Sequence, residues 1–375
     1  MSSADGLAPP FLWPPGLTLP TAKTIYLDLN HWVSLAKANT GHRDGSEFKP
    51  VLEACADAAA RGFAFPISGV TYIEVSKIRD PRQRRDLADV ITLLSGHTSV
   101  LSHPLIVQFE LDAAISARLG VPSRASQDLP YLGSGVGWAF GGRLTPTFTD
   151  ATGQDRRVEL MATLQGQQVI SDMTTDFEFY ALSGPDDEEA EQLRAGGWSP
   201  DAAWQTAVQR AESERVQAGL FDAVHQGVGS TEAERLAAHT ADRRDWRRGR
   251  LRDAIAVREL TRCIGDVFGE VLSWYGQPSL EQLWGDRTGA RTFLRQMPSS
   301  EVAVELKTVL HRDRARAKRW KPNDVLDIDQ LAITVPYCDV VVSEKAACDA
   351  LIKARLDERC QTVVLTRLSD LSPHI

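Results

Sequence analysis

The amino-acid sequence predicts an α/β protein in which a parallel sheet is flanked by helices and interrupted by a large, mostly α-helical insertion. Short apolar runs alternate with helical patterns over residues 24–120, and the same alternation returns near residue 320. Strands separated by helices indicate a parallel sheet. We therefore expect a discontinuous α/β domain over 23–120 and 320–375, a helical subdomain over 121–319, and a disordered or surface-hugging N-terminal arm over 1–22.

The first half of the α/β domain is expected to alternate strands and helices. Its helix at 31–38 places Trp32, Leu35 and Ala36 on one side, and its last helix ends at Gly120. The expected strands are 24–27, 63–67 and 99–101, and the expected helices are 31–38, 48–61, 71–78, 86–94 and 106–119.

The pattern changes near residue 121. A glycine-rich stretch at 133–142 could cradle phosphate through backbone N–H groups, but it lacks the GxxxxGK[ST] pattern and a preceding strand. We interpret it as a flexible loop at the boundary of the insertion. Residues 155–318 are charged, rich in alanine and helical in pattern. The C-terminal segment is expected to form a helix at 324–335, a strand at 340–343, a helix at 344–359 and a strand at 362–365.

Composition excludes several classes of protein. The formal net charge of −8 means that any nucleic-acid surface must be local. Five scattered cysteines form no CxxC pair, so neither a disulfide framework nor structural zinc is expected, and a reducing cytoplasm is the default location. The sequence contains no run of 18 apolar residues, so no membrane span is expected, and its proline-rich start does not resemble a signal peptide.

Three acidic residues lie at or near the ends of apolar runs. Asp28 closes the first run, Glu74 follows the second, and Asp327 precedes the run at 340–343. Sites in open α/β sheets form at the carboxyl ends of strands. Carboxylates that converge there would repel one another unless a cation lay between them. The pattern predicts a Mg²⁺ or Mn²⁺ site, and such a site suggests phosphodiester hydrolysis.

These acidic segments resemble the three motifs of the PIN-domain ribonuclease family. Residues 25–32 (IYLDLNHW) form an apolar strand that ends in Asp and leads into a helix. Residues 66–74 (PISGVTYIE) form a strand, a Ser turn and a helix that carries Glu. The third motif is 327–332 (DIDQLA) followed by 338–344 (CDVVVSE). The family places an Asp directly after the last Ser or Thr, where this chain has Glu344.

The resemblance implies a PIN-like sheet and a metal-dependent endoribonuclease that cuts RNA and leaves a 5′-phosphate. Asp28 and Asp327 would ligate Mg²⁺ or Mn²⁺, and Glu74 would complete the cluster or orient a metal-bound water. Glu344 would act as the fourth acid of the catalytic set, with Asp339 as the alternative. The metal would lower the pKa of its water and offset charge on the transition state. Asn30 and Ser343 are the expected substrate-binding residues within the motifs.

Each of these residues also has a structural interpretation. Asp28 could serve only as the N-cap of the following helix. Glu74 taken alone reads as a solvated helix residue, and Asp324 as a cap of the helix that carries Asp327. Asp329 is balanced between a neighbour of the ligands and an exposed charge. Ser343 could simply end a strand.

A basic segment lies directly before Asp327. Its Arg316, Lys318, Arg319 and Lys321 accompany a tryptophan, a combination suited to clamping phosphate and stacking on an unpaired base. We predict that it binds nucleic acid, most simply single-stranded RNA. A similar segment at 243–250 is equally well explained as a solvated helix face, and 79–85 is a weaker basic patch.

Two other functions remain open. The altered fourth acid suggests a non-catalytic PIN-like module for binding or assembly. The same carboxylate chemistry would also serve a nuclease that cuts DNA flaps or single strands. The helical insertion argues against a compact toxin of the toxin–antitoxin type and is compatible with a homo-oligomer or a regulatory protein partner.

Overall fold

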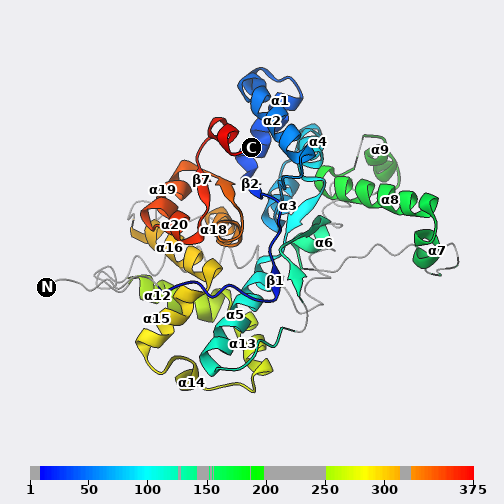
Figure 1. Ribbon diagram of the computed structural model, residues 1–375. Coiled ribbons are helices and arrows are strands. Elements are labelled where there is room, and N and C mark those ends of the chain that lie inside the picture. Colours follow the sequence, from blue (N-terminus) through cyan, green and yellow to red (C-terminus); the bar gives the residue numbers. More distant parts are fainter. Residues whose placement is uncertain are drawn as a thin grey trace.

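The centre of the α/β part is a sheet of three short parallel strands (Figure 1). The computed structural model describes residues 9–125, 128–141, 156–185, 187–197, 251–312 and 322–375, together with Thr152 and Gln154. β2 (Ile25–Leu27), β6 (Val340–Val342) and β7 (Val363–Leu365) pair in that order, which confirms three predicted strands. The chain is thus a mixed α/β protein whose sheet joins segments from both of its ends.

The sheet extends past β2 through a segment that forms only isolated bridges. Ala64 pairs with Thr24, and Ile67 pairs with Ser99 on β3 (Thr98–Val100). The predicted continuous strand at 63–67 is therefore wrong in detail. Pro66 has no N–H to donate to a neighbouring strand, which accounts for the interruption. β3 then pairs antiparallel with β5 (Leu132–Ser134).

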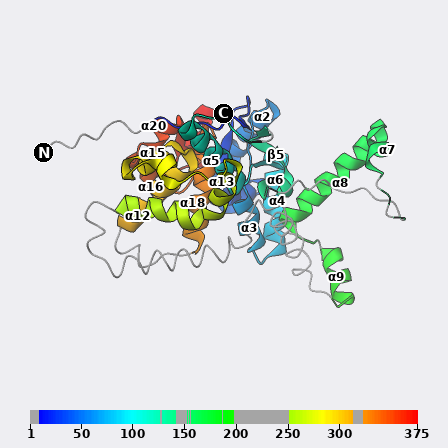
Figure 2. The same cartoon turned by 90° about the horizontal axis from the view of Figure 1, so that it is seen from below.

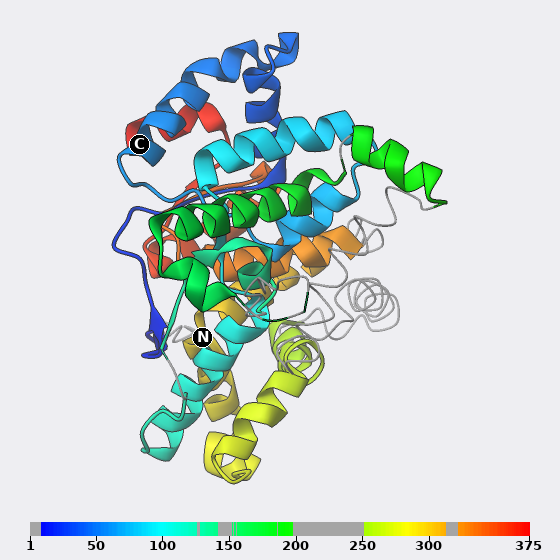
Figure 3. The same ribbon diagram turned by 90° about the vertical axis from the view of Figure 1, so that its right-hand side faces the viewer.

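Helices cover both faces of this sheet (Figures 1 and 3). The N-terminal helices are α1 (Leu29–Asn39), α2 (Lys49–Ala60), α3 (Gly69–Ser76), α4 (Pro81–Ser95) and α5 (His103–Leu119), with a 3₁₀ helix at Arg43–Phe48. The C-terminal helices are α18 (Pro322–Thr334), α19 (Lys345–Lys353) and α20 (Leu356–Cys360), with a 3₁₀ helix at Leu368–His374. The predicted single helix at 344–359 is wrong: Arg355 adopts a left-handed φ of 56° and separates α19 from α20.

The middle of the chain is mostly helical where it is described. It contains α7 (Arg157–Met161), α8 (Leu164–Ser183), α9 (Asp187–Ala195), α12 (Leu251–Arg258), a π-helical turn (Glu259–Cys263), α13 (Gly265–Trp274), α14 (Leu280–Trp284), α15 (Arg287–Gln296) and α16 (Pro298–Arg312). The expected flexible loop is wrong for 133–141. Those residues form most of β5 and then α6 (Gly135–Ala139), because β3 offers a free edge and α8 caps the turn.

The sheet separates two hydrophobic cores. Ile25 and Leu27 face one core, whereas Tyr26 faces the other, as the alternation of side chains along a strand requires. The second core also receives side chains from α5, α16, α18 and α19. A third core joins α5 to α12–α16. Because α5 and α16 take part in two cores, the helical region packs directly on the α/β part.

The described part of the N-terminal arm lies against this body. β1 (Leu17–Thr18) pairs with β4 (Leu129–Pro130), and the Leu12 N–H donates to the Gln296 carbonyl at 2.8 Å. The ring of Trp13 meets Tyr337 edge-on, with centroids 5.7 Å apart. Residues 9–22 thus follow the surface-hugging alternative.

Candidate active site

Asp28 is fixed at the point where β2 passes into α1. Its N–H donates to the Val342 carbonyl at 3.0 Å, which ties it to the end of β6. One carboxylate oxygen accepts the Leu29 N–H at 2.7 Å, and the other accepts the Ser343 hydroxyl at 3.0 Å. Asp28 is therefore the N-cap of α1, and its second oxygen still faces a pocket.

The place of Asp28 in the sheet is typical of ligand sites. β2 and β6 are neighbours in the sheet. The next sheet segment after β2, at 64–67, lies on the far side of β2, whereas the strand after β6, β7, lies on the far side of β6. The carboxyl ends of β2 and β6 thus form the position where the strand order reverses, which is where open α/β sheets bind ligands. Asp28, Ser343 and Glu344 directly follow these two strands.

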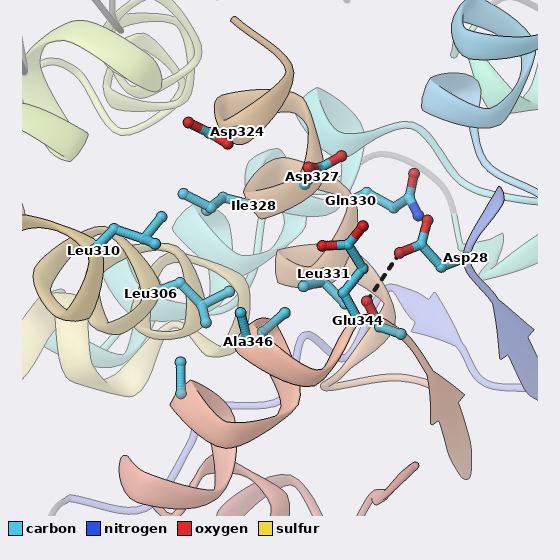
Figure 4. Close-up of a pocket in the computed structure, with 13 residues that line it drawn as sticks. Asp28, Leu306, Leu310, Asp324, Asp327, Ile328, Gln330, Leu331, Glu344 and Ala346 are labelled. Carbon is cyan, nitrogen blue, oxygen red and sulfur yellow. Dashed lines mark hydrogen bonds between the residues drawn. The ribbon is translucent and has the colours of Figure 1, made fainter. Parts of the chain in front are cut away.

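A pocket opens at this position between α16, α18 and α19 (Figure 4). Asp28, Asp327 and Glu344 border one shared space in it. The Asn30 amide donates to Glu344 at 2.9 Å, which orients that carboxylate. The complete lining is Asp28, Leu306, Leu310, Asp324, Asp327, Ile328, Gln330, Leu331, Ser343, Glu344, Ala346, Ala347 and Ala350.

Glu74 stands outside this lining but belongs to the same electrostatic site. It is half-buried on α3. Burial raises the pKa of Glu74 to about 7, and the negative charge of Asp28 adds to this shift. Partial burial raises the pKa of Asp327 to about 8, with Glu74 and Asp28 as the strongest charges acting on it. Asp327 nevertheless remains exposed and lines the pocket. The carboxylates therefore repel one another at neutral pH.

The carboxylate oxygens at this pocket are suitable ligands for a hard divalent cation, although among the described residues they are not already arranged around one position. Among the described residues, no three His, Cys, Asp or Glu side chains lie close enough together to hold an ion. Mg²⁺ keeps several waters and commonly takes only one or two carboxylates. The Asp28 oxygen that accepts from Ser343 retains a lone pair, and together with Asp327 and Glu344 across the pocket it would supply that kind of ligation. Side-chain rotation would be needed to bring them together.

His31 was missed from the sequence. It lies in the first turn of α1, and burial lowers its pKa although the charge of Asp28 opposes this shift. Its ring also hydrogen-bonds the Ser343 backbone. The remaining ring nitrogen, Nε2, is buried without a hydrogen-bond partner. Its position three residues after Asp28, one helical turn along α1, was the signal that could have pointed to it.

Three other acidic residues have roles that differ from those expected. Asp339 accepts the Thr24 N–H at 2.7 Å at the opposite end of the strands, so the alternative that it tunes the metal site is wrong. Asp329 is buried, and its charge acts on Lys307. Asp324 lies within the first turn of α18 and borders the pocket, so it is not the N-cap.

The predicted basic residues Arg316, Lys318, Arg319 and Lys321 lie outside the described residues, as does the segment 243–250. α16 ends at Arg312, the last described residue before the basic segment, and Arg312 is exposed. The predicted RNA-binding segment therefore stays a prediction.

Comparison of the chain with models of protein families, with curated proteins and with solved structures gave no match. Across the part of the chain that the structure describes, no helix combines the length and apolar character needed to cross a bilayer.

Proposed function

We propose that this protein is a metal-dependent endoribonuclease with a PIN-like α/β domain, formed by 23–120 and 320–375 and interrupted by the helical insertion. The observation that carries the proposal is the position of the carboxylates. Asp28, Asp327 and Glu344 border one pocket where the strand order reverses, and their charges act on one another and on Glu74. Mg²⁺ or Mn²⁺ would relieve that repulsion and attract a phosphodiester.

The side chains divide the work in this proposal. Asp28 and Asp327 would hold the cation, which would supply an activated water and offset charge at the phosphate. Glu74, with its pKa raised to about 7, accepts a proton from water near neutral pH. Ser343 and Asn30 are committed to Asp28 and Glu344, so we assign them to positioning these carboxylates.

The substrate assignment rests on the sequence. We propose that single-stranded RNA is the substrate and that Arg316, Lys318, Arg319 and Lys321 contact its backbone, because this basic segment leads directly into α18. We place the protein in the cytoplasm on the basis of its scattered, unpaired thiols.

The test is the cleavage of single-stranded RNA in the presence of Mn²⁺ by Asp28→Asn and Asp327→Asn. We expect each change to reduce the single-turnover rate by at least about a hundredfold, as the loss of a ligand commonly does. Asp339→Asn is the matched control, because that carboxylate lies at the other end of the strands. Full Mn²⁺-dependent cleavage by the Asp28→Asn/Asp327→Asn double variant would refute the proposal.

A non-catalytic PIN-like module is the second candidate. It is favoured by the absence, among the described residues, of three potential ligands close enough to hold an ion. Calorimetric titration with MnCl₂ separates the two. A nuclease site binds Mn²⁺ and loses this binding in Asp28→Asn, whereas an inert module shows no binding. Matched RNA and DNA oligonucleotides then decide between an endoribonuclease and a nuclease for DNA single strands or flaps.

A further inference from the structure

Gln330 is a buried amide that lines the acidic pocket (Figure 4). Only 3% of the residue is exposed, and it lies on α18 three residues after Asp327, so the two side chains are neighbours on the helix surface. The pocket has a volume of about 50 Å³, which corresponds to about four water-sized groups. A ligand atom that meets Gln330 there must therefore belong to a small group.

The Gln330 amide is chemically unlike the rest of the pocket. It carries the only side-chain N–H groups in the described lining, and the charged side chains of that lining are all acidic. The Ser343 hydroxyl is the other side-chain donor there, and it already donates to Asp28 at 3.0 Å. An anionic ligand would thus meet repulsion from the carboxylates everywhere except at a bound cation and at Gln330.

The orientation of the Gln330 amide is set by α3. Ser68, the N-cap of α3, donates its hydroxyl to the Gln330 Oε1 at 3.4 Å. The same hydroxyl accepts the Thr71 N–H at 3.3 Å and lies 3.2 Å from the Tyr26 hydroxyl. α3 lies beside α18 in two perpendicular views (Figures 1 and 2). Because Ser68 engages the oxygen, the amide nitrogen is turned toward Asp28 (Figure 4).

The nitrogen of this amide forms no hydrogen bond with any of the described residues, whereas the oxygen is engaged by Ser68. Buried amide N–H groups in native proteins almost always have a partner, because an unpaired one has lost its hydration without compensation. A buried donor that is held in one orientation at the border of a pocket points to a small hydrogen-bond acceptor as its ligand.

We propose that Gln330 is a catalytic residue that donates a hydrogen bond from its amide nitrogen to a non-bridging oxygen of the scissile phosphate. This inference rests on the proposed function. The cation would offset charge on one phosphate oxygen, and the amide would meet a second oxygen as the attacking water adds negative charge. Ser68 is the positioning residue, because it holds the amide with its nitrogen toward the pocket.

A neutral donor suits this position better than a cationic one. A Lys or Arg side chain beside Asp327 would pair with the carboxylates and compete with the metal ion for them. An amide can donate to the phosphate without neutralising the ligands of the cation. The proposal therefore predicts that phosphate contact and metal binding can be separated by substitution at Gln330.

The test is the single-turnover cleavage of single-stranded RNA at saturating Mn²⁺ by Gln330→Met, which keeps the length of the side chain and removes the N–H. We expect cleavage to be about thirtyfold slower, as for the loss of one hydrogen bond to a charged group. The Mn²⁺ affinity from calorimetric titration should not change. Gln108→Met is the matched control, because it removes an amide that is 9% exposed and donates to Glu270 on α13 at 2.9 Å. It should keep the full rate.

A double-mutant cycle tests the positioning role of Ser68. Ser68→Ala removes the hydroxyl that holds the amide oxygen, so we expect a smaller loss of rate, about fivefold. Ser68→Ala/Gln330→Met should be no slower than Gln330→Met alone, because both changes act through the same hydrogen bond to the phosphate. Losses that multiply in the double variant overturn the positioning role.

The outcomes separate this inference from the proposed function. If the unmodified protein cleaves RNA and Gln330→Met cleaves it equally fast, the assignment of Gln330 fails and the nuclease remains. Weaker Mn²⁺ binding by Gln330→Met also overturns the assignment, because the amide would then act on the metal ligands and not on the phosphate. If the unmodified protein neither binds Mn²⁺ nor cleaves RNA, the proposed function and this inference fail together.

Discussion

Asp28 has a structural role and a proposed chemical role at the same time. One carboxylate oxygen caps α1 through the Leu29 N–H, and the other accepts from Ser343 and borders the pocket. The two interpretations that the sequence left open for Asp28 are therefore compatible. A substitution that keeps the helix cap but removes the negative charge separates the capping role of Asp28 from its proposed metal-binding role.

We predict that Asp28→Asn and Asp28→Ala differ in stability but agree in metal binding. Asparagine is a good N-cap, so Asp28→Asn should change the free energy of unfolding by no more than about 0.5 kcal/mol, whereas Asp28→Ala should lower it by about 1–2 kcal/mol. Both should abolish Mn²⁺ binding. Urea denaturation and calorimetric titration measure the two properties. Equal destabilisation by both substitutions would mean that the carboxylate charge, and not the cap, stabilises α1.

At the scale of elements, the sequence predicted strands and helices wherever local pattern decides the structure. The apolar run that ends at Asp28 became β2, and the helix that follows became α1. The errors occurred where tertiary contacts decide. Residues 133–141 read as a loop because their glycines suit turns, yet Gly133 and Ser134 pair with β3 as part of β5, and α6 follows directly. No local sequence pattern predicts the left-handed φ of Arg355, which divides the last helical segment.

The close contact between Gly135, at the start of α6, and Glu178 on α8 can be tested by substitution. The φ of 79° at Gly135 disfavours a side chain, and a Cβ at this position would collide with the Glu178 carboxylate, which accepts the Val136 N–H at 2.7 Å. We predict that Gly135→Ala lowers the free energy of unfolding by about 3 kcal/mol or more, from strain and overpacking combined.

Gly62→Ala is the control for this prediction, because Gly62 also has a positive φ, of 94°, but no atom near a Cβ. It should cost only about 1 kcal/mol. Thermal denaturation of both variants provides the comparison, and equal losses would show that the contact with Glu178 is unimportant.

At the scale of the whole molecule, the candidate site depends on strand order, which the sequence did not supply. Motif spacing identified Asp28, Asp327 and Glu344, and the structure brings them to one pocket. The reversal of strand order between β2 and β6 and the wall that α16 gives to the pocket arise only when distant segments pack together. The helical region reads as separate in sequence because its pattern is continuous, although α5 and α16 connect it to the sheet.

The same packing leaves several carboxyl groups with raised pKa values. Burial raises the pKa of Glu110, which is completely buried and accepts the Ser299 N–H and the Tyr337 hydroxyl, to about 7. Burial also raises the pKa of Glu178 to about 7. Glu74 and Asp327 also have raised pKa values, of about 7 and about 8. Glu74 and Asp327 lie at the proposed metal site, whereas Glu110 and Glu178 each lie elsewhere, with separate partners.

These shifts predict that the metal-free protein loses stability as the pH rises from about 5 to 8. A carboxyl group whose pKa is higher in the folded state binds its proton more tightly there, so the stabilisation is present at low pH and is lost as the pH passes through the folded pKa. Glu110 alone should contribute on the order of 2 kcal/mol to this loss, and Glu110→Gln should remove its share. Saturating Mg²⁺ should restore the share of Glu74 and Asp327 but not that of Glu110 or Glu178. Urea denaturation at pH 5, 6, 7 and 8, with and without MgCl₂, measures both effects, and a metal-free stability that increases steadily over this range would contradict the prediction.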